Sequence, residues 1–457
     1  MRVLLIYPNA NKKVLSWGDT GALAEPIALE YIAAVAEQEG CEVKLLDLRL
    51  HNELLEETLS SFAPDVVGLT GYSMHVLRCL EVAALAKEIL PSCRTVVGGH
   101  HATLEPVDFQ EPQIDYIVCG EGTSAFRALL AQIEEKDLDR SISGVYARRN
   151  GSFHYGGPPG PLHIDDIPIP DRRLTPEDRA NYFIDWMKPI AMMRTSVGCP
   201  YRCSFCSLWR LMNGRYHVRD LDRVVEELKT IDEKSIFLVD DEPFVNAMRM
   251  RDLAGKIERS GIKKHFFSYC RTDSLIRERE TVRQWRDIGL RRLLLGIETV
   301  FDDEAARYNK KQNNAQVIKA IQIGAELDVH LLCNFIVHPS YTEKEFNGLI
   351  GFIKENDIQY PSFTIWTPLP GTPCRDMDIL IRQPNGRPNW DYFDLQHPVT
   401  KTALPLAEFH RQFNRLWQVF TPNYLKYHPD NPLYRKPLME LAARVLGCKT
   451  GNGEENR

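Results

Sequence analysis

The first 140 residues alternate between short apolar runs and segments whose apolar residues recur at helical spacing. The runs with the length and composition of buried strands are 2–7, 43–48, 65–71, 95–100 and 114–120. The segments with helical spacing are 26–39, 53–62, 76–90 and 124–135. Regular alternation of strand and helix predicts a parallel, doubly wound sheet with five strands, of the Rossmann-like class.

Residues 141–190 interrupt this alternation. Proline and glycine are dense in 156–161 and again in 167–170, and both residues break helices and sheets. We therefore expect a linker with little regular structure.

From residue 191 the alternation begins again. The predicted strands are 191–196, 236–240, 266–271, 293–298, 330–337 and 363–367. The predicted helices between them are 220–230, 246–260, 279–288, 314–326 and 343–355. Six strand–helix units indicate a partial (β/α)6 barrel, and the chemistry of such barrels lies at the carboxyl ends of the strands.

Composition narrows the range of partners. The chain of 457 residues has a formal charge of −6, which provides no basic stripe for nucleic acid. It has neither a cationic and apolar leader at its start nor a run of about 20 apolar residues, so we expect a cytoplasmic protein without a membrane span. Eight of the 11 cysteines are scattered on apolar stretches, and we expect them to be small buried hydrophobic residues.

The other three cysteines, Cys199, Cys203 and Cys206, have the spacing C-x3-C-x2-C. Three thiolates within eight residues suit an iron–sulfur cluster or zinc. A closed structural zinc site needs four protein ligands, and the next candidate, His217, is eleven residues further on. Three ligands on a four-iron cube leave one iron open to a ligand that is not protein. The cluster is the favoured interpretation, and a zinc knuckle is the alternative.

A C-x3-C-x2-C motif after an apolar strand resembles the radical S-adenosylmethionine enzymes. The resemblance implies a [4Fe–4S] cluster whose open iron is chelated by the amino and carboxylate groups of S-adenosylmethionine. At the strand ends it implies that Asp240 and Asp241 meet the amino group, and acidic acceptors suit an ammonium group. Capping of the following helix is an equally weighted alternative for these carboxylates. In the same way Arg271 would meet the methionine carboxylate, Glu298 the ribose, and Phe335 the adenine ring.

The first 140 residues, placed ahead of that motif, resemble the cobalamin-binding domain of cobalamin-dependent members of this family. Glycine follows several predicted strands, where it allows a ligand close to the backbone, although glycine is also usual in any strand-to-helix turn. Ligands of doubly wound sheets bind at these strand ends. The expected cobalamin-binding residues are Tyr7, Thr70, Ser73, Gly98, Gly99, His100, Gly120 and Glu121.

One feature of many cobalamin modules is missing. No Asp-x-His-x-x-Gly string occurs, and His75, His100 and His101 lack that context. We therefore expect cobalamin to bind with its own base displaced from cobalt and with no histidine beneath the metal.

The predicted boundaries are thus 1–140, 141–190, 191–385 and an aromatic-rich extension at 386–457. Within the extension, Leu406, Phe409, Phe413, Leu416, Trp417 and Phe420 share one helical face. This pattern favours a helix that packs over the barrel mouth, and part of its surface is a candidate wall for a large apolar substrate. The runs 236–241, 256–259, 285–290 and 393–398 resemble the bacterial hopanoid C-3 methylases.

The resemblance implies a methyltransferase that acts on an unactivated carbon of a hopanoid-like lipid. A 5′-deoxyadenosyl radical would remove hydrogen, and methylcobalamin would supply the methyl group, so no catalytic side chain is expected. The expected partners are the apolar substrate and an electron donor such as flavodoxin or ferredoxin, and any membrane contact would be peripheral. The alternatives are a tetrapyrrole-type oxidative cyclase with the same cofactors and a non-catalytic cobalamin or redox sensor.

Overall fold

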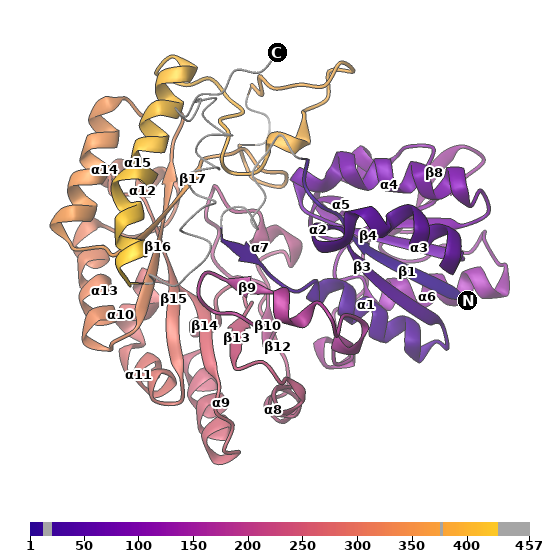
Figure 1. The fold of residues 1–457 in the computed structure, drawn as a ribbon, viewed down its shortest axis with the longest axis horizontal. Helices are drawn as coiled ribbons and strands as arrows, with labels where there is room; N and C mark the ends of the chain where they lie inside the picture. Colours follow the sequence, from indigo (N-terminus) through magenta and orange to yellow (C-terminus); the bar gives the residue numbers. More distant parts are fainter. Residues whose placement is uncertain (12–20, 375–377, 428–457) are drawn as a thin grey trace, which may run out of the picture.

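The computed structural model describes residues 1–11, 21–374 and 378–427 of the chain, and it forms two lobes, each built on one mostly or wholly parallel sheet (Figure 1). The first lobe contains a seven-stranded sheet in the order β3-β1-β4-β5-β6-β7-β8. Its strands are β1 Arg2–Tyr7, β3 Glu42–Asp47, β4 Val66–Thr70, β5 Arg94–Gly98, β6 Tyr116–Val118, β7 Val145–Arg149 and β8 Ser152–Tyr155. The strands β1, β3, β4, β5 and β6 of this sheet are parallel, which confirms the predicted doubly wound fold.

Helices cover both faces of this sheet. One face packs against α1 Ile27–Gln38 and α6 Thr123–Glu135, and the other packs against α3 Leu55–Phe62 and α4 Val76–Ile89. The short helices of this lobe are α2 Leu48–His51 and α5 His100–Leu104. The strand next to the edge, β1, is buried along four of its six residues, as its continuous apolar run predicts.

The last two strands of the first sheet correct the expectation of an irregular linker. Strands β7 and β8 pair antiparallel with each other and with β6. Their turn is Asn150-Gly151, and both residues have positive φ, at 49° and 84°. An Asn-Gly pair between alternating residues is a strong hairpin signal, and the proline and glycine that follow it obscured this hairpin in the sequence.

The second lobe is an open barrel with six parallel strands in the order β10-β13-β14-β15-β16-β17. The strands are β10 Ile190–Met193, β13 Ser235–Leu238, β14 His265–Arg271, β15 Leu290–Glu298, β16 His330–Val337 and β17 Tyr360–Ile365. The outer helices are α8 Leu221–Thr230, α9 Ala247–Arg259, α11 Arg279–Asp287, α13 Asn314–Glu326, α14 Glu343–Glu355 and α15 Leu406–Tyr427. The remaining short elements are β2 Ala22–Leu23, β9 Phe183–Ile184, β11 Ser196–Val197, β12 His217–Val218, α7 Leu208–Leu211, α10 Thr272–Arg277 and α12 Asp302–Arg307. The predicted partial barrel is confirmed.

Helix α15 does not cover the barrel mouth as its aromatic face suggested. It packs beside α14 on the outer face of β17 and so completes the helix layer. The ring of Phe363 on β17 meets Trp417 at 5.2 Å and Phe420 at 6.0 Å between centroids. Phe413 is 3% exposed in this core, whereas Leu406 is exposed. The aromatic face therefore shields the last strand, which no further strand–helix unit would cover.

Buried ion pairs tie the segment between the lobes to both of them. Arg172 meets Glu25 at 3.4 Å in the first lobe and Glu227 at 3.0 Å on α8. Arg179 pairs with Glu25 and, at 2.5 Å, with Glu233. The carboxylates of Glu25 and Glu227 are fully buried, and removing one partner of such a pair typically costs about 3–5 kcal/mol. This network fixes the two sheets relative to each other.

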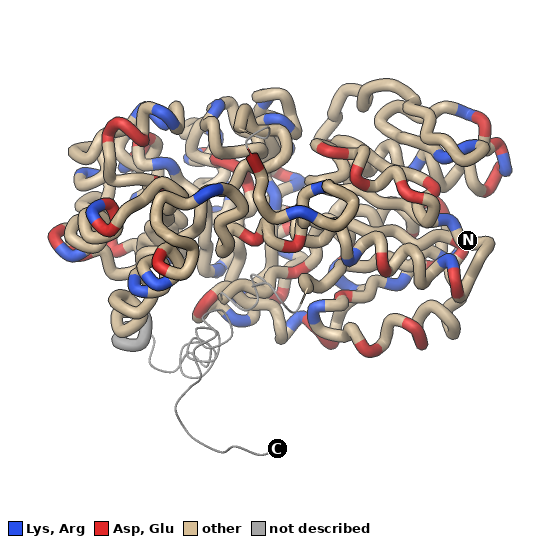
Figure 2. Tube along the Cα trace, turned by 90° about the horizontal axis from the view of Figure 1, so that it is seen from above, with Lys and Arg blue, Asp and Glu red and all other residues tan. Residues whose placement is uncertain are grey.

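Charged residues of both signs are interspersed along the chain trace, as Figure 2 shows. Among the described residues, no helix combines the length and the apolar character needed to cross a membrane.

Gly99 provides a test of the strand-end geometry in the first lobe. Its φ is +95°, and an added Cβ would lie 2.4 Å from Thr70 Oγ1. Gly157 has nearly the same φ, +96°, but nothing lies within 4 Å of its added Cβ. The backbone strain of about 1–2 kcal/mol is shared by the two alanine variants, whereas the clash is present only at Gly99. We expect Gly99→Ala to lower the thermal unfolding temperature more than Gly157→Ala, and equal decreases would contradict the close contact with Thr70.

Candidate active site between the two sheets

The carboxyl ends of the strands in the two sheets face each other. His100, after β5, shares a hydrogen bond of 2.9 Å between its Nε2 and Ser207 Oγ, next to Cys206. Arg194, after β10, reaches Glu121, after β6, at 3.4 Å. Tyr72, after β4, also lies near the barrel. Burial raises the pKa of Tyr72 most, and the charges of neighbouring groups, including Tyr269 and Asp241 in the barrel, raise it further. The residues that follow the strands of both sheets thus share one region.

A cavity of about 680 Å³ that opens to solvent lies at the barrel mouth. All three cysteines of the C-x3-C-x2-C motif line it, and none forms a disulfide. No group of three or more His, Cys, Asp or Glu side chains in 1–11, 21–374 and 378–427 is placed to hold a single metal ion. This arrangement fits a cluster, because each thiolate of a four-iron cube binds a different iron. Burial raises the pKa of Cys199 to about 11 and of Cys206 to about 12, so metal binding must displace their protons.

The three consecutive carboxylates after β13 have different positions. Asp240 is fully buried and accepts hydrogen bonds from Thr195 N, Thr195 Oγ1 and Ser196 N at 2.5–2.6 Å. Asp240 therefore stabilises the backbone at the start of the cysteine loop and does not line the cavity. This position corrects the expectation that Asp240 contacts the amino group of S-adenosylmethionine. Asp241 lines the cavity and accepts a hydrogen bond from Gly198 N at 2.8 Å.

Glu242 also lines the cavity, although the sequence favoured its two neighbours. Burial raises the pKa of Glu242 to about 7, and burial followed by the charge of Asp240 raises the pKa of Asp241 to about 6. A cationic ligand group beside them would favour their charged forms. These two carboxylates fit the amino group of S-adenosylmethionine.

Glu298 lies in the cavity wall with a backbone φ of 68° at a β-bulge. Its carboxylate meets Lys310 Nζ at 2.8 Å and Asn334 Nδ2 at 3.2 Å. Gly296 is required beside it, since an added Cβ would lie 2.5 Å from Glu298 Oε1. The position is compatible with the expected ribose contact, and no sequence pattern singled out Lys310 as its partner.

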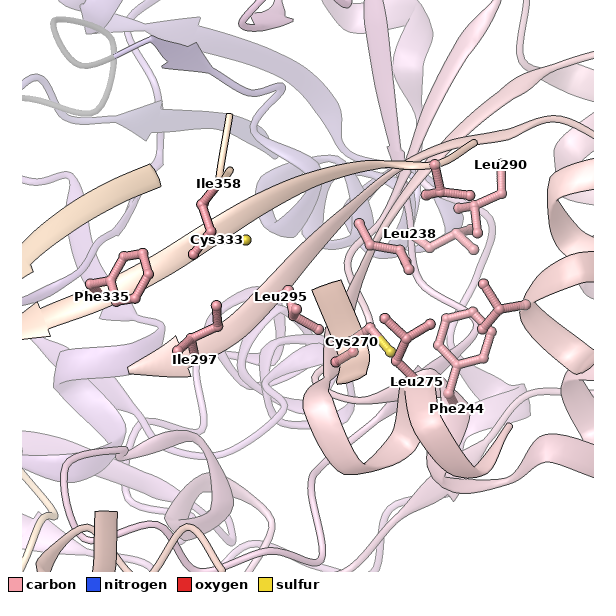
Figure 3. Close-up of a cluster of buried hydrophobic side chains, with 14 of the residues drawn as sticks. Leu238, Phe244, Cys270, Leu275, Leu290, Leu295, Ile297, Cys333, Phe335 and Ile358 are labelled. Atoms are coloured by element: carbon pink, nitrogen blue, oxygen red, sulfur yellow. The ribbon is translucent and has the colours of Figure 1, made fainter. Parts of the chain in front are cut away.

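Phe335 does not lie in the cavity. It is 1% exposed and belongs to the core between the barrel strands and the outer helices, with Leu295, Ile297 and Cys333 (Figure 3). Side chains alternate along a strand, so Asn334 points to the barrel interior and Phe335 to the helices. The expectation that Phe335 packs on adenine is therefore wrong.

The cavity also has an apolar wall that the sequence did not identify. Tyr201, Phe205, Leu208, Trp209, Tyr269 and Leu294 contribute to it. Four of these residues lie in or directly after the cysteine motif. The motif itself could have indicated them, because a loop that holds a cluster also brings its intervening side chains to the mouth.

The expected cobalamin-binding residues lie at the carboxyl ends of β1, β4, β5 and β6 in the first sheet, or directly after them. An added Cβ would be tightly surrounded at Gly99 and Gly120 but would make only ordinary contacts at Gly98, and Tyr7 and Thr70 lie at the ends of their strands. Two others have structural partners: Ser73 Oγ lies 3.0 Å from His101 Nδ1, and Glu121 accepts a hydrogen bond from Thr123 N at 3.0 Å. The structure thus offers a glycine-lined edge for a ligand.

Comparison with known proteins agrees with this arrangement. Residues 18–130 match the B12 binding domain, and residues 193–353 match the radical SAM superfamily. The chain is 31% identical to an uncharacterized methyltransferase from Pyrococcus horikoshii over 88% of each chain. The chain belongs to the cobalamin-dependent radical S-adenosylmethionine methyltransferases. The cofactors of this family are a [4Fe–4S] cluster, S-adenosylmethionine and cobalamin, as the sequence predicted.

Other relatives of this radical methyltransferase differ in what they act on. The chain is 29% identical to the hopanoid C-3 methylase of Methylococcus capsulatus, over 100% of this chain and 85% of the relative. It is 25% identical to the anaerobic magnesium-protoporphyrin IX monomethyl ester cyclase of Cereibacter sphaeroides, over 98% and 74% of the two chains. The cobalamin-dependent radical enzyme OxsB shares the fold at a TM-score of 0.71 and 16% identity, over 97% of this chain and 71% of OxsB.

We expect Cys199, Cys203 and Cys206 to hold all of the cluster iron. Anaerobically reconstituted protein should contain about four irons, and the triple Cys→Ala variant should lose both the iron and the cluster absorbance. Cys374→Ala is the matched control, because Cys374 is half-buried and lies outside the motif. Full iron content in the triple variant, measured by colorimetric iron assay, would contradict the assignment.

Proposed function

We propose that this enzyme methylates an unactivated carbon of a large apolar substrate, of the hopanoid type. The observation that carries the proposal is the cavity in which the cysteine motif, two buried carboxylates and an apolar wall meet. The bound cofactors supply the radical that removes hydrogen and the methyl group that replaces it. The protein contributes binding, orientation and exclusion of water.

In this proposal the three cysteines hold the cluster, and Asp241 and Glu242 accept the amino group of S-adenosylmethionine. Glu298 accepts the ribose hydroxyls while Lys310 and Asn334 fix its carboxylate. The rings of Tyr201, Phe205, Trp209 and Tyr269 form the wall against which an apolar substrate packs. Phe413 and its neighbours on α15 belong to the core and are not available to a substrate. The proposal of a lipid substrate therefore rests on this apolar wall and not on the aromatic face of α15.

The structure supports cobalamin binding without a protein histidine. His75 accepts a hydrogen bond at Nδ1 from Tyr72 N at 3.2 Å, and His101 lies between Ser73 and Asp108. His100 is engaged with Ser207. Burial lowers the pKa of His75 to about 3 and of His100 to about 4, so both are neutral parts of the packed edge.

An external one-electron donor of the flavodoxin or ferredoxin class fits the surface beside the cysteine loop. Residues 199–216 and 305–313 contain no Asp or Glu. Arg202, Arg210, Arg215 and Lys311 are exposed there. A hydrogen bond of 3.0 Å from Asn309 Nδ2 to Arg202 O joins the two segments. Such a cationic surface is complementary to an acidic donor protein.

We expect lipid extracts from cells that express the enzyme to contain a product one methylene heavier than its precursor. Cells that express the triple cysteine variant provide the control, because only the expected cluster ligands are changed in it. High-resolution mass spectrometry with methyl-labelled methionine tests the transfer directly. A product that has lost hydrogens without gaining label would favour the oxidative cyclase, and a labelled hydrophilic metabolite would exclude the lipid substrate.

We expect the cob(II)alamin form of the enzyme to lack nitrogen superhyperfine splitting in its electron paramagnetic resonance spectrum. The reason is that His75, His100 and His101 already form hydrogen bonds within the protein, and His75 and His101 are also buried. Free cob(II)alamin in the same buffer, with its own base on cobalt, is the reference. Splitting from a single nitrogen in the protein-bound form would show that a base or a histidine occupies the lower face.

A further inference from the structure

Arg271, at the end of β14, has all three guanidinium nitrogens engaged. Nε donates to Asp273 Oδ1 at 2.8 Å, and Nη2 donates to Lys310 O at 3.0 Å. Nη1 donates to Cys203 Sγ at 3.5 Å. The guanidinium carbon also lies 3.8 Å from the centre of the Tyr201 ring. The side chain is thus 8% exposed and belongs to the support of the cysteine loop.

Arg271 lines the cavity, but protein acceptors already use three of its five guanidinium N–H groups, so the expected contact with the methionine carboxylate has at most one N–H from each terminal nitrogen. Bidentate recognition needs an edge of two guanidinium nitrogens that is open to the ligand. In Arg271 the nitrogens already have acceptors in the protein, and the ring of Tyr201 stacks on the guanidinium. Two of its partners, Tyr201 and Cys203, belong to the cysteine motif, and Cys203 is more deeply buried than Cys199 and Cys206.

We propose that Arg271 is a positioning residue of the cluster, which holds the Cys203 thiolate and raises the reduction potential of the [4Fe–4S] centre. The inference rests on the proposed function, because it requires Cys203 to be a cluster ligand. Reduction adds one electron and makes the cluster more negative. A buried cation that donates a hydrogen bond to a ligand sulfur stabilises that added charge.

The backbone of the cysteine loop has supports that do not involve this side chain. Ser204 N donates to Tyr308 O at 3.0 Å, and Asn309 Nδ2 donates to Arg202 O at 3.0 Å. On the opposite side, Asp240 binds the backbone N–H groups of Thr195 and Ser196. Because these contacts remain, we expect variants of Arg271 to fold and to keep the loop in place.

The test is the midpoint potential of the cluster in the full-length, anaerobically reconstituted enzyme, measured without S-adenosylmethionine. We expect Arg271→Met to make the midpoint potential more negative by at least about 59 mV, which is a tenfold change in the equilibrium constant of a one-electron reduction. Arg271→Lys keeps a charge but loses the planar fork, so a smaller shift in the same direction is expected. Arg202→Met is the matched control, because Arg202 is an exposed cation of the same loop whose charge is screened by solvent.

Iron content and S-adenosylmethionine affinity separate the other outcomes. An absence of cluster from the wild-type enzyme would refute the proposed function itself. Unchanged potentials in both Arg271 variants would overturn the inference, and weaker S-adenosylmethionine binding in them would instead identify a carboxylate ligand. If both Arg271 variants fold but lose iron, while Arg202→Met keeps its full iron content, the result would support the role of Arg271 in positioning Cys203.

Discussion

The site depends on the direction of the strands in two sheets. In a parallel sheet every strand ends at the same edge, so the loops that follow the strands gather there. In this enzyme two such edges face each other, and contacts from His100 to Ser207 and from Arg194 to Glu121 join them. The expected cobalamin-binding residues are thereby placed opposite the cavity that the cysteine motif lines. The buried pairs of Arg172 and Arg179 with carboxylates of both lobes keep this arrangement fixed.

The carboxylates beside the cysteine loop show that residues of the same type have different roles when their side chains are buried in different places. Asp240, Asp241 and Glu242 are consecutive, yet Asp240 is fully buried against the backbone of Thr195 and Ser196 and does not line the cavity. The other two face the cavity with raised pKa values, where a positive ligand group is favourable. Arg271 contributes to both, because its side chain lines the cavity and also donates hydrogen bonds to Cys203 and to Lys310 O.

The positions of the aromatic side chains determine which of them are available to contact a substrate. The aromatic side chains of α15 complete the core over β17, and Trp390 and Phe393 pack into the core of the first lobe. The rings that are left to meet a substrate belong to the cysteine loop and to the barrel interior. Most of the apolar wall and the three cysteines of the motif therefore come from the same short segment, which would bring the proposed apolar substrate close to the cofactors.

The sequence by itself determined the order of strands and helices, the two parallel architectures and the cysteine triad, because these depend on local periodicity and on spacing along the chain. It also placed Asp241 and Glu298 at the mouth, since strand ends can be located from apolar runs. Only the tertiary structure decided which of several candidates face the cavity. A shift of one residue along a strand moves a side chain to the other face, as Phe335 and Asn334 show. The partners of Arg271 and Glu298, among them Lys310, come from segments distant in the chain, and no local pattern determines such contacts.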